Sequence, residues 1–199
     1  MGLTIKNLCT PANLVTLGRI ALLLPLAVLI RLDSLWIRLF YLAMIPVLFY
    51  LDSLDGYLAR RCDCETRLGA LLDIAGDRIV ENVLWLVLAY LHLIPFWIPV
   101  FVLIRGFLTD GFRSAALSAG EKSTFSMMRS KTGWWLVASP LSRTLYAVLK
   151  AAVFTAGVAI WTFELDLYGL FYLLVALTLL HSTLRGVFTI LESSRSLSP

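Results

Sequence analysis

Apolar residues run along this chain in six long stretches, separated by short polar connections. A helix needs about twenty residues to cross roughly 30 Å of hydrocarbon, and each stretch is long enough. The connections at 32–34, 94–95 and 163–165 are very short, so the helices that they join should form antiparallel hairpins. We therefore predict an all-α integral membrane bundle with a short N-terminal juxtamembrane segment, forming one domain over residues 1–199. The six predicted transmembrane helices cover residues 12–31, 35–60, 69–93, 96–117, 141–162 and 166–191.

The composition agrees with a membrane environment. Hydrophobic residues make up 59% of the 199 residues and charged residues only 15%, whereas a soluble domain is about half apolar. The net charge of +4 needs no nucleic acid to explain it, because basic residues beside membrane spans set topology or meet anionic lipid.

The distribution of basic residues predicts which side of the membrane each loop occupies. Arginine and lysine gather in the loops around 60–68 and 113–143, whereas the opposite face mixes charges of both signs. By the positive-inside tendency, both termini and both basic loops should be cytoplasmic. The stretch 119–140 is polar with scattered apolar residues, and we expect it to lie on the cytoplasmic surface as an interfacial segment.

Four carboxylates fall inside predicted spans, where an ionisable group is costly and by default faces a functional cavity. Asp52 and Asp55 are spaced i, i+3 near the end of the second span, and Asp73 and Asp77 are spaced i, i+4 near the start of the third. Each pair therefore lies on one helix face, and the two pairs should sit at matching depth beside the intervening turn. Four acids at one level repel strongly, so the pattern predicts a site for hard divalent cations with oxygen ligands.

Small residues and one arginine extend this site. Gly56 and Ala59 continue the stripe of the second-span acids, and Gly69 lies one turn before the third-span pair. Such residues let helices or a flat ligand approach the backbone, while Arg60 adds a fork suited to phosphate oxygens. Taken alone, small residues indicate helix packing, an arginine at a span end indicates topology, and intramembrane acids indicate an ion pathway. Their joint order favours adjoining sites for metal, nucleotide and phosphate.

This order of residues resembles the signature of the CDP-alcohol phosphotransferases. The likeness extends to Asn13, Thr16 and Arg19 on the first span, and to six spans with cytoplasmic termini. All eight signature positions match, in the order Asp52-x-x-Asp55-Gly56-x-x-Ala59-Arg60, then eight residues, then Gly69-x-x-x-Asp73-x-x-x-Asp77.

The resemblance implies an enzyme that moves a phosphatidyl-type group from a CDP-lipid such as CDP-diacylglycerol to the hydroxyl of a small alcohol, with CMP leaving. It implies a homodimer among membrane lipid, in a bacterial-type inner or cell membrane, with the site facing the cytoplasm. It implies Asp77 as the general base. Two Mg²⁺ or Mn²⁺ ions would lie between Asp52, Asp55, Asp73 and Asp77. The CDP contacts would come from Asn13, Thr16, Gly56, Ala59, Arg60 and Gly69.

Basic residues outside the signature bear on the acceptor. Arg105 and Arg113 share a face of the fourth span, while Arg143, Tyr146 and Lys150 form a stripe entering the fifth. Arg105 and Lys150 lie deep in their spans, where topology explains a charge poorly. We hypothesise that the four cations bind an acceptor that carries its own phosphate.

The segment 105–113 is similar to the fourth-span region of bacterial phosphatidylglycerophosphate synthases, which favours glycerol 3-phosphate as acceptor. Three residues depart from their usual pattern: Gly106 replaces an acid, Asp110 adds a negative charge, and Arg78 follows the last signature aspartate in place of lysine. Inositol phosphate is the nearest competitor, followed by other polar alcohols. The rival from another class is a small divalent-metal transporter that uses the four aspartates as its binding site.

Overall fold

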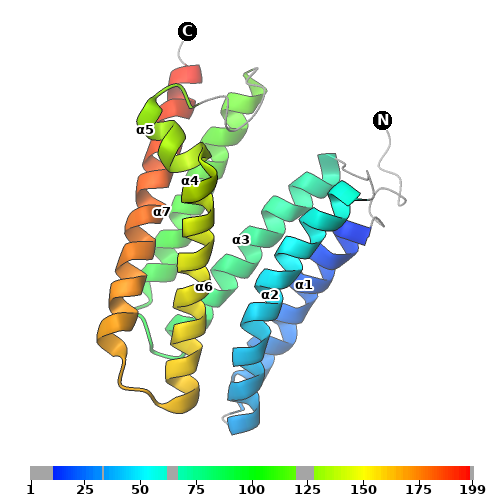
Figure 1. Cartoon of the computed structure of the whole chain (residues 1–199), viewed down its shortest axis with the longest axis vertical. Helices are drawn as coiled ribbons and strands as arrows, with labels where there is room; N and C mark the ends of the chain where they lie inside the picture. The colour runs from blue at the N-terminus through cyan, green and yellow to red at the C-terminus, as the bar shows by residue number, and fades with distance from the viewer. Residues whose placement is uncertain (1–10, 33, 62–66, 120–127, 198–199) are drawn as a thin grey trace. The chain divides into compact units, whose positions relative to one another are not determined.

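The computed structural model describes residues 11–32, 34–61, 67–119 and 128–197, although the side chains of 53 and 55–60, and of a few residues at other helix ends, lie outside the description. Every regular element in these ranges is helical, which confirms the all-α prediction for this part of the chain (Figure 1). The elements are α1 (Pro11–Leu29), α2 (Leu35–Arg61), α3 (Arg67–Tyr90), α4 (Trp97–Ser118), α5 (Lys131–Gly133), the π-helix η2 (Trp134–Ala138), α6 (Pro140–Phe163) and α7 (Tyr168–Leu197).

The six long helices lie where the apolar stretches predicted them, with ends that differ by a few residues. Three of them contain windows that are long and apolar enough to cross a membrane, at Leu35–Asp52, Pro140–Phe163 and Tyr168–Arg195, and α1 adds a shorter apolar stretch at Asn13–Leu29. Helices α3 and α4 are of comparable length, with 24 and 22 residues, but they carry several charged side chains. The structure thus supports three of the six predicted spans, and the other three stay predictions.

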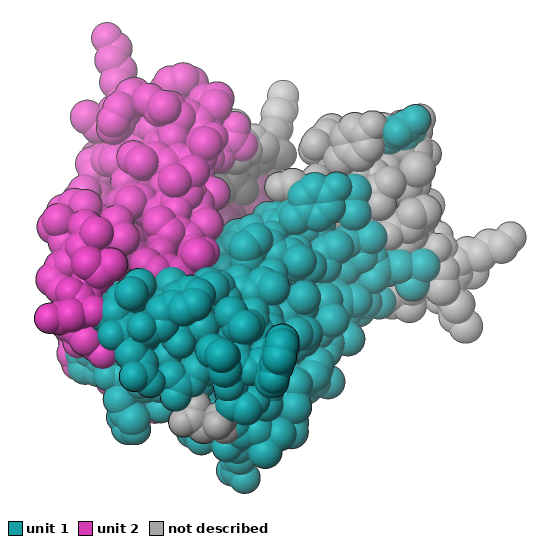
Figure 2. Space-filling model, turned by 60° about the horizontal axis from the view of Figure 1, so that its bottom comes forward, with its two compact units in different colours: residues 1–95, 157–165 teal, residues 96–156, 166–199 magenta. Residues whose placement is uncertain are grey.

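The chain divides into two compact units, coloured separately in Figure 2. Unit 1 comprises residues 1–95 and 157–165, and unit 2 comprises residues 96–156 and 166–199. One of the boundaries falls within α6, whose first seventeen residues (140–156) belong to unit 2 and whose last residues (157–163) belong to unit 1.

Unit 1 is organised around α1, which packs against both α2 and α3. Leu26 of α1, Leu48 of α2 and Trp85 of α3 are among its fully buried side chains. Gly76 of α3 faces α1 so closely that a Cβ atom there would lie 2.8 Å from Cγ2 of Thr16. The absence of a side chain at Gly76 therefore lets α3 approach α1 at the depth of the polar residues on α1.

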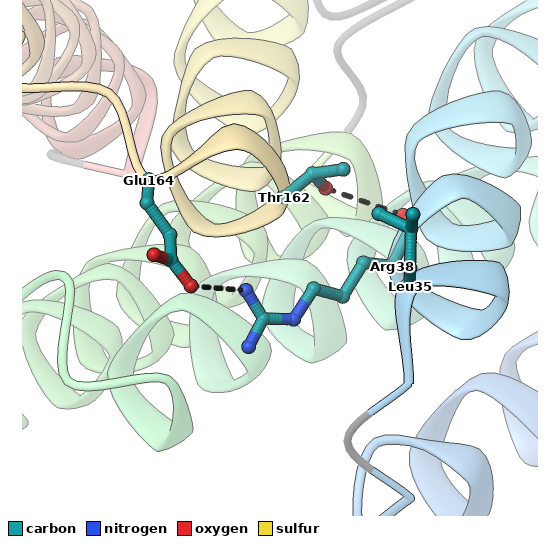
Figure 3. Close-up of a pocket in the computed structure, with 4 residues that line it drawn as sticks. All are labelled: Leu35, Arg38, Thr162 and Glu164. Carbon is teal, nitrogen blue, oxygen red and sulfur yellow. Dashed lines mark hydrogen bonds and ion pairs between the residues drawn. The ribbon is translucent and has the colours of Figure 1, made fainter.

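At the other end of α2, Arg38 ties the start of that helix to the end of α6 (Figure 3). Its guanidinium donates to the carbonyl of Trp161 at 2.8 Å and to the carboxylate of Glu164 at 3.1 Å. The Thr162 hydroxyl lies 3.3 Å from the Arg38 carbonyl oxygen. The contact with Trp161 satisfies a carbonyl that the last turn of α6 leaves unpaired. With Leu35, the three side chains of Arg38, Thr162 and Glu164 line a cavity of about 280 Å³.

Unit 2 is organised around α7, which packs against α4, α5 and η2. Gly186 of α7 lies against α4, because a Cβ atom there would meet Thr109 Cγ2 at 3.2 Å and Arg105 Cγ at 3.3 Å. Glu192 is 2% exposed, and its carboxylate accepts from the backbone N–H of Arg129 at 3.3 Å. The predicted interfacial stretch 119–140 thus contains α5 and η2, packed on α7, while its residues 120–127 lie outside the described residues.

Candidate active site

Three of the four predicted metal-binding aspartates come together in unit 1. Asp52 of α2 and Asp73 and Asp77 of α3 each offer a carboxylate oxygen, and these oxygens lie within 4.8 Å of one another. All three side chains are partly or well exposed, so an ion could reach them from solvent. The cluster is rich in the hard oxygen ligands that divalent cations such as Mg²⁺ prefer. The fourth aspartate, Asp55, is carried by α2, but its side chain lies outside the described residues.

Arg19 of α1 is the counter-charge of this cluster, and the sequence reasoning did not count it among the site residues. Its side chain is almost fully buried, and its guanidinium forms ion pairs with Asp52 and, at 2.8 Å, with Asp77. A buried arginine that holds two carboxylates fixes their positions and offsets part of their repulsion. Arg19 carries one positive charge, so it offsets the charge of only one of the three acids.

Arg19 belongs to a polar stripe on α1. Asn13, Thr16 and Arg19 are spaced three residues apart, and all three are at most 3% exposed, in a helix whose other buried residues are mostly apolar. That spacing places them along one helix face. Three polar residues on one face of an apolar helix were a signal in the sequence that Arg19 faces the protein.

The remaining predicted CDP contacts are only partly described. Gly69 lies in the first turn of α3 and is half-buried. Gly56, Ala59 and Arg60 lie in the last part of α2, and their side chains lie outside the described residues. The nucleotide role of these residues, and of Asn13 and Thr16, stays a prediction.

The predicted acceptor cations belong to unit 2, where the structure adds a fifth basic residue. Arg105 and Arg113 come from α4, Arg143 and Lys150 from α6. Arg105, Lys150 and Arg185 of α7 all contact the side chain of Tyr146, and the charges of Arg113 and Arg143 also act on Arg185. We refer to these five residues as the basic cluster. An arginine inside the last predicted span is itself a sign of function, and that sign was available in the sequence.

Neutral groups and one acid hold this basic cluster in place. The Arg185 guanidinium donates to the carbonyls of Leu136 and Val137 in η2, at 2.8 and 3.2 Å, and to the Ser142 hydroxyl at 3.0 Å. Arg113 forms an ion pair of 3.7 Å with Asp110, one turn earlier on α4. The acid that departs from the expected fourth-span pattern therefore offsets part of the charge of one predicted acceptor cation.

Comparison with known proteins adds independent information. The family model described as CDP-alcohol phosphatidyltransferase matches residues 9–193, most of the chain. A Bacillus subtilis protein named CDP-diacylglycerol–glycerol-3-phosphate 3-phosphatidyltransferase is 30% identical over 136 residues, which cover 61% of this chain and 69% of that protein.

Two further relatives have different names. A Drosophila melanogaster protein, named a probable cardiolipin synthase (CMP-forming), is 29% identical over 180 residues, covering 84% of this chain and 54% of that protein. The Escherichia coli inner membrane protein YnbA is 45% identical over 83 residues, covering 40% of each chain. The matched segments thus span between 40% and 69% of these relatives.

Proposed function

The chain belongs to the CDP-alcohol phosphatidyltransferase family, and on that premise we propose that it transfers a phosphatidyl group from CDP-diacylglycerol to glycerol 3-phosphate and releases CMP. The observation that carries this proposal is the cluster of Asp52, Asp73 and Asp77, whose residues occupy the signature positions of the family and whose oxygens converge. The name of the Bacillus subtilis relative supports glycerol 3-phosphate as the acceptor. The words "CMP-forming" in the name of the Drosophila relative support CMP as the leaving group.

Two divalent ions, Mg²⁺ or Mn²⁺, would be held by the aspartates of the cluster together with Asp55. The donor set fits, because carboxylate oxygens on two helices converge and carry more negative charge than Arg19 offsets. When bound, such ions neutralise the diphosphate and stabilise charge on the departing CMP.

The chain's own residues bind the substrate and move the proton. Asp77 accepts the proton of the acceptor hydroxyl, whose oxygen then forms a bond to the β-phosphorus of CDP-diacylglycerol. The bond from that phosphorus to the bridging oxygen breaks, and CMP leaves with the electron pair. Arg19 orients Asp77 through their ion pair. Contacts to the cytidine and its phosphates are assigned to Asn13, Thr16, Gly56, Ala59, Arg60 and Gly69.

The basic cluster of unit 2 would bind the phosphate of the acceptor. Arginine forks pair well with phosphate oxygens, and a cluster of like charges gains most from an anion. Inositol phosphate would satisfy the same cations, so the charge of the cluster supports the class of acceptor and the relatives' names support glycerol 3-phosphate. The assigned cations are Arg105, Arg113, Arg143 and Lys150.

The chain is a multi-pass membrane protein, and we assign all six long helices to the membrane with both termini and the aspartate cluster at the cytoplasmic face. A site at that face would admit the nucleotide from water while the lipid tails stay in the bilayer. We further propose that residues 1–199 are a single functional domain and that the protein is a homodimer.

The proposal is tested by CMP release from purified protein supplied with Mg²⁺, CDP-diacylglycerol and a panel of acceptors. Glycerol 3-phosphate should be the best acceptor, ahead of inositol phosphate, inositol, serine and choline, and EDTA should stop the reaction. If only uncharged alcohols work, the role assigned to the basic cluster is wrong.

Replacement of Asp77 tests its proposed role as the general base. Asp77→Asn should lower CMP release by about 10²–10⁴-fold, because general-base catalysis contributes that much. Asp166→Asn, an exposed acid of unit 2, is the matched control and should leave the rate unchanged. Retained activity in Asp77→Asn would contradict the assignment of Asp77 as the general base.

The rival function, a divalent-metal transporter, makes a different prediction. Metal uptake by vesicles that contain the purified protein, without CMP release, would favour the transporter.

A further inference from the structure

Tyr146 of α6 lies at the centre of the basic cluster of unit 2. Its hydroxyl oxygen accepts a long hydrogen bond of 3.4 Å from the Arg105 guanidinium of α4. Its ring lies 4.7 Å from the Lys150 ammonium, one turn along α6, and 5.6 Å from the Arg185 guanidinium of α7. One side chain thus contacts cations from three helices.

A tyrosine suits this position because it interacts favourably with cations in two ways. The electron-rich face of its ring attracts an ammonium or guanidinium within about 6 Å of the centroid. Its oxygen accepts from a third cation in the ring plane. Arg105, Lys150 and Arg185 repel one another, and their contacts with one shared neutral side chain offset part of that repulsion.

The other contacts of Arg185 restrict how far it can move. Its two terminal nitrogens donate to the carbonyls of Leu136 and Val137 and to Ser142, so the guanidinium is fixed relative to η2. The ring of His181, one turn earlier on α7, lies 5.8 Å from the Tyr146 ring between centroids and is tilted against it by 34°, and its Nε2 lies 3.3 Å from the Ser142 hydroxyl. Tyr146 therefore contacts one arginine that is held by three hydrogen bonds, a second arginine on α4, and a lysine on its own helix.

We propose that Tyr146 is a positioning residue that selects acceptors carrying a phosphate, by holding Arg105, Lys150 and Arg185 together as one anion site. The proposal rests on the function proposed above, because it assigns the basic cluster to the acceptor. The residue acts through the cations that it gathers, and its effect should appear in the affinity for the phosphorylated acceptor rather than in the chemical step.

Two variants separate the hydroxyl from the ring. In purified full-length protein, Tyr146→Phe should raise KM for glycerol 3-phosphate by about two- to tenfold, the range for loss of one hydrogen bond, with kcat and KM for CDP-diacylglycerol unchanged. Tyr146→Leu removes the ring as well, so KM should rise further, by about another twofold or more for each cation released. The preference for glycerol 3-phosphate over glycerol should fall in the same order.

The matched control is Tyr172→Phe, the same chemical change at an exposed position of α7, and it should change neither KM nor the preference. A purely structural role would instead lower the rates with glycerol 3-phosphate and glycerol equally. Unchanged KM in both Tyr146 variants, or an equal loss with both acceptors, would overturn the proposal.

A binding measurement distinguishes this proposal from the proposed function. Inorganic phosphate should raise the thermal unfolding temperature of the wild-type protein, and raise it less in Tyr146→Phe. If that difference is found but glycerol 3-phosphate is no substrate, the anion site stands and the acceptor is wrong. If glycerol 3-phosphate is a substrate but phosphate stabilises both proteins equally and KM is unchanged, the function stands and the role of Tyr146 is wrong.

Discussion

Unit 1 gathers carboxylates around an arginine, whereas unit 2 gathers arginines around a tyrosine. In unit 1 the opposite charges contact one another directly, in the ion pairs from Arg19 to Asp52 and Asp77. In unit 2, Arg185 donates to the carbonyls of η2 and to the Ser142 hydroxyl, and Arg105 donates to the Tyr146 hydroxyl, which are all neutral groups.

The difference indicates how each unit holds its charged groups in place. A neutral carbonyl or ring orients a cation without cancelling its charge, so these contacts leave the attraction of Arg105 and Arg185 for an anion in place. Arg19 brings one positive charge to three carboxylates, so its ion pairs offset only part of their attraction for cations. The contacts in each unit thus position charged groups without fully neutralising them.

The largest effect should follow from removing the arginine of unit 1. Arg19→Met keeps the volume of the side chain but leaves two carboxylates without their ion pair. Breaking a buried pair costs roughly 3–5 kcal/mol, and the loss should lie toward the lower end because Asp52 and Asp77 are 39% and 49% exposed. The thermal unfolding temperature in detergent and the rate of CMP release should both fall.

Arg19→Lys is the matched variant, since it keeps the charge without the fork that reaches two carboxylates. It should lie between Arg19→Met and the wild type. Added Mg²⁺ should restore part of the unfolding temperature of Arg19→Met, because the ion supplies the missing positive charge. Wild-type stability and activity in Arg19→Met would show that the ion pairs contribute nothing.

A smaller effect should follow from a methyl group at the close helix contacts. Gly76→Ala would place a Cβ 2.8 Å from Thr16, and overpacking of this kind costs roughly 1–3 kcal/mol. Gly186→Ala should cost less, because its nearest atoms lie at 3.2–3.4 Å and the flexible stem of Arg105 can shift. Gly76→Ala should raise the Mg²⁺ concentration needed for half-maximal CMP release, because α3 carries Asp73 and Asp77. Gly186→Ala should raise KM for glycerol 3-phosphate.

Two other glycines provide controls for those variants. Among the described residues, no atom beyond the local helix backbone lies within 4 Å of a Cβ added at Gly18 of α1 or Gly111 of α4, so their alanine variants should unfold at the wild-type temperature or above it. Equal losses at all four positions would show that the close approach of the helices is unimportant.

The smallest effect should come from the acid within the basic cluster. Asp110→Asn removes the charge that pairs with Arg113 at 3.7 Å. A partly exposed pair is worth only about 0.2–1 kcal/mol, so KM for glycerol 3-phosphate should fall no more than a few-fold, with kcat unchanged. Asp166→Asn serves again as the control. An increase in KM would mean that Asp110 itself supports acceptor binding.

The placement of the acidic cluster could be predicted from local patterns. Asp52 lies near the end of one apolar stretch and Asp73 and Asp77 near the start of the next, and helical periodicity then puts the acids on facing sides of a hairpin. Proximity in sequence makes such an inference reliable. The six long helices followed in the same way from the lengths of the apolar stretches.

The partners of these acids could not be predicted in that way. Arg19 is separated from Asp52 by 33 residues and from Asp77 by 58. In the sequence it stood out only as part of the family resemblance on the first predicted span. Arg185 was passed over, although its position inside an apolar stretch could have marked it. Helical periodicity predicts neither the ion pairs of Arg19 with the aspartates nor the contact of Arg185 with Tyr146, because each joins helices that are distant in sequence.

The sequence by itself determined the helices, the faces on which their charged residues lie and the family signature, because each depends on residues within one or two neighbouring helices. Only the tertiary structure decided which charges meet. Arg19 pairs with Asp77 only because α1 and α3 come close together, and Gly76 permits that approach. Tyr146 contacts cations from α4, α6 and α7, and Gly186 permits the close approach of α7 to α4. Packing of this kind is set by side chains from distant parts of the chain acting together.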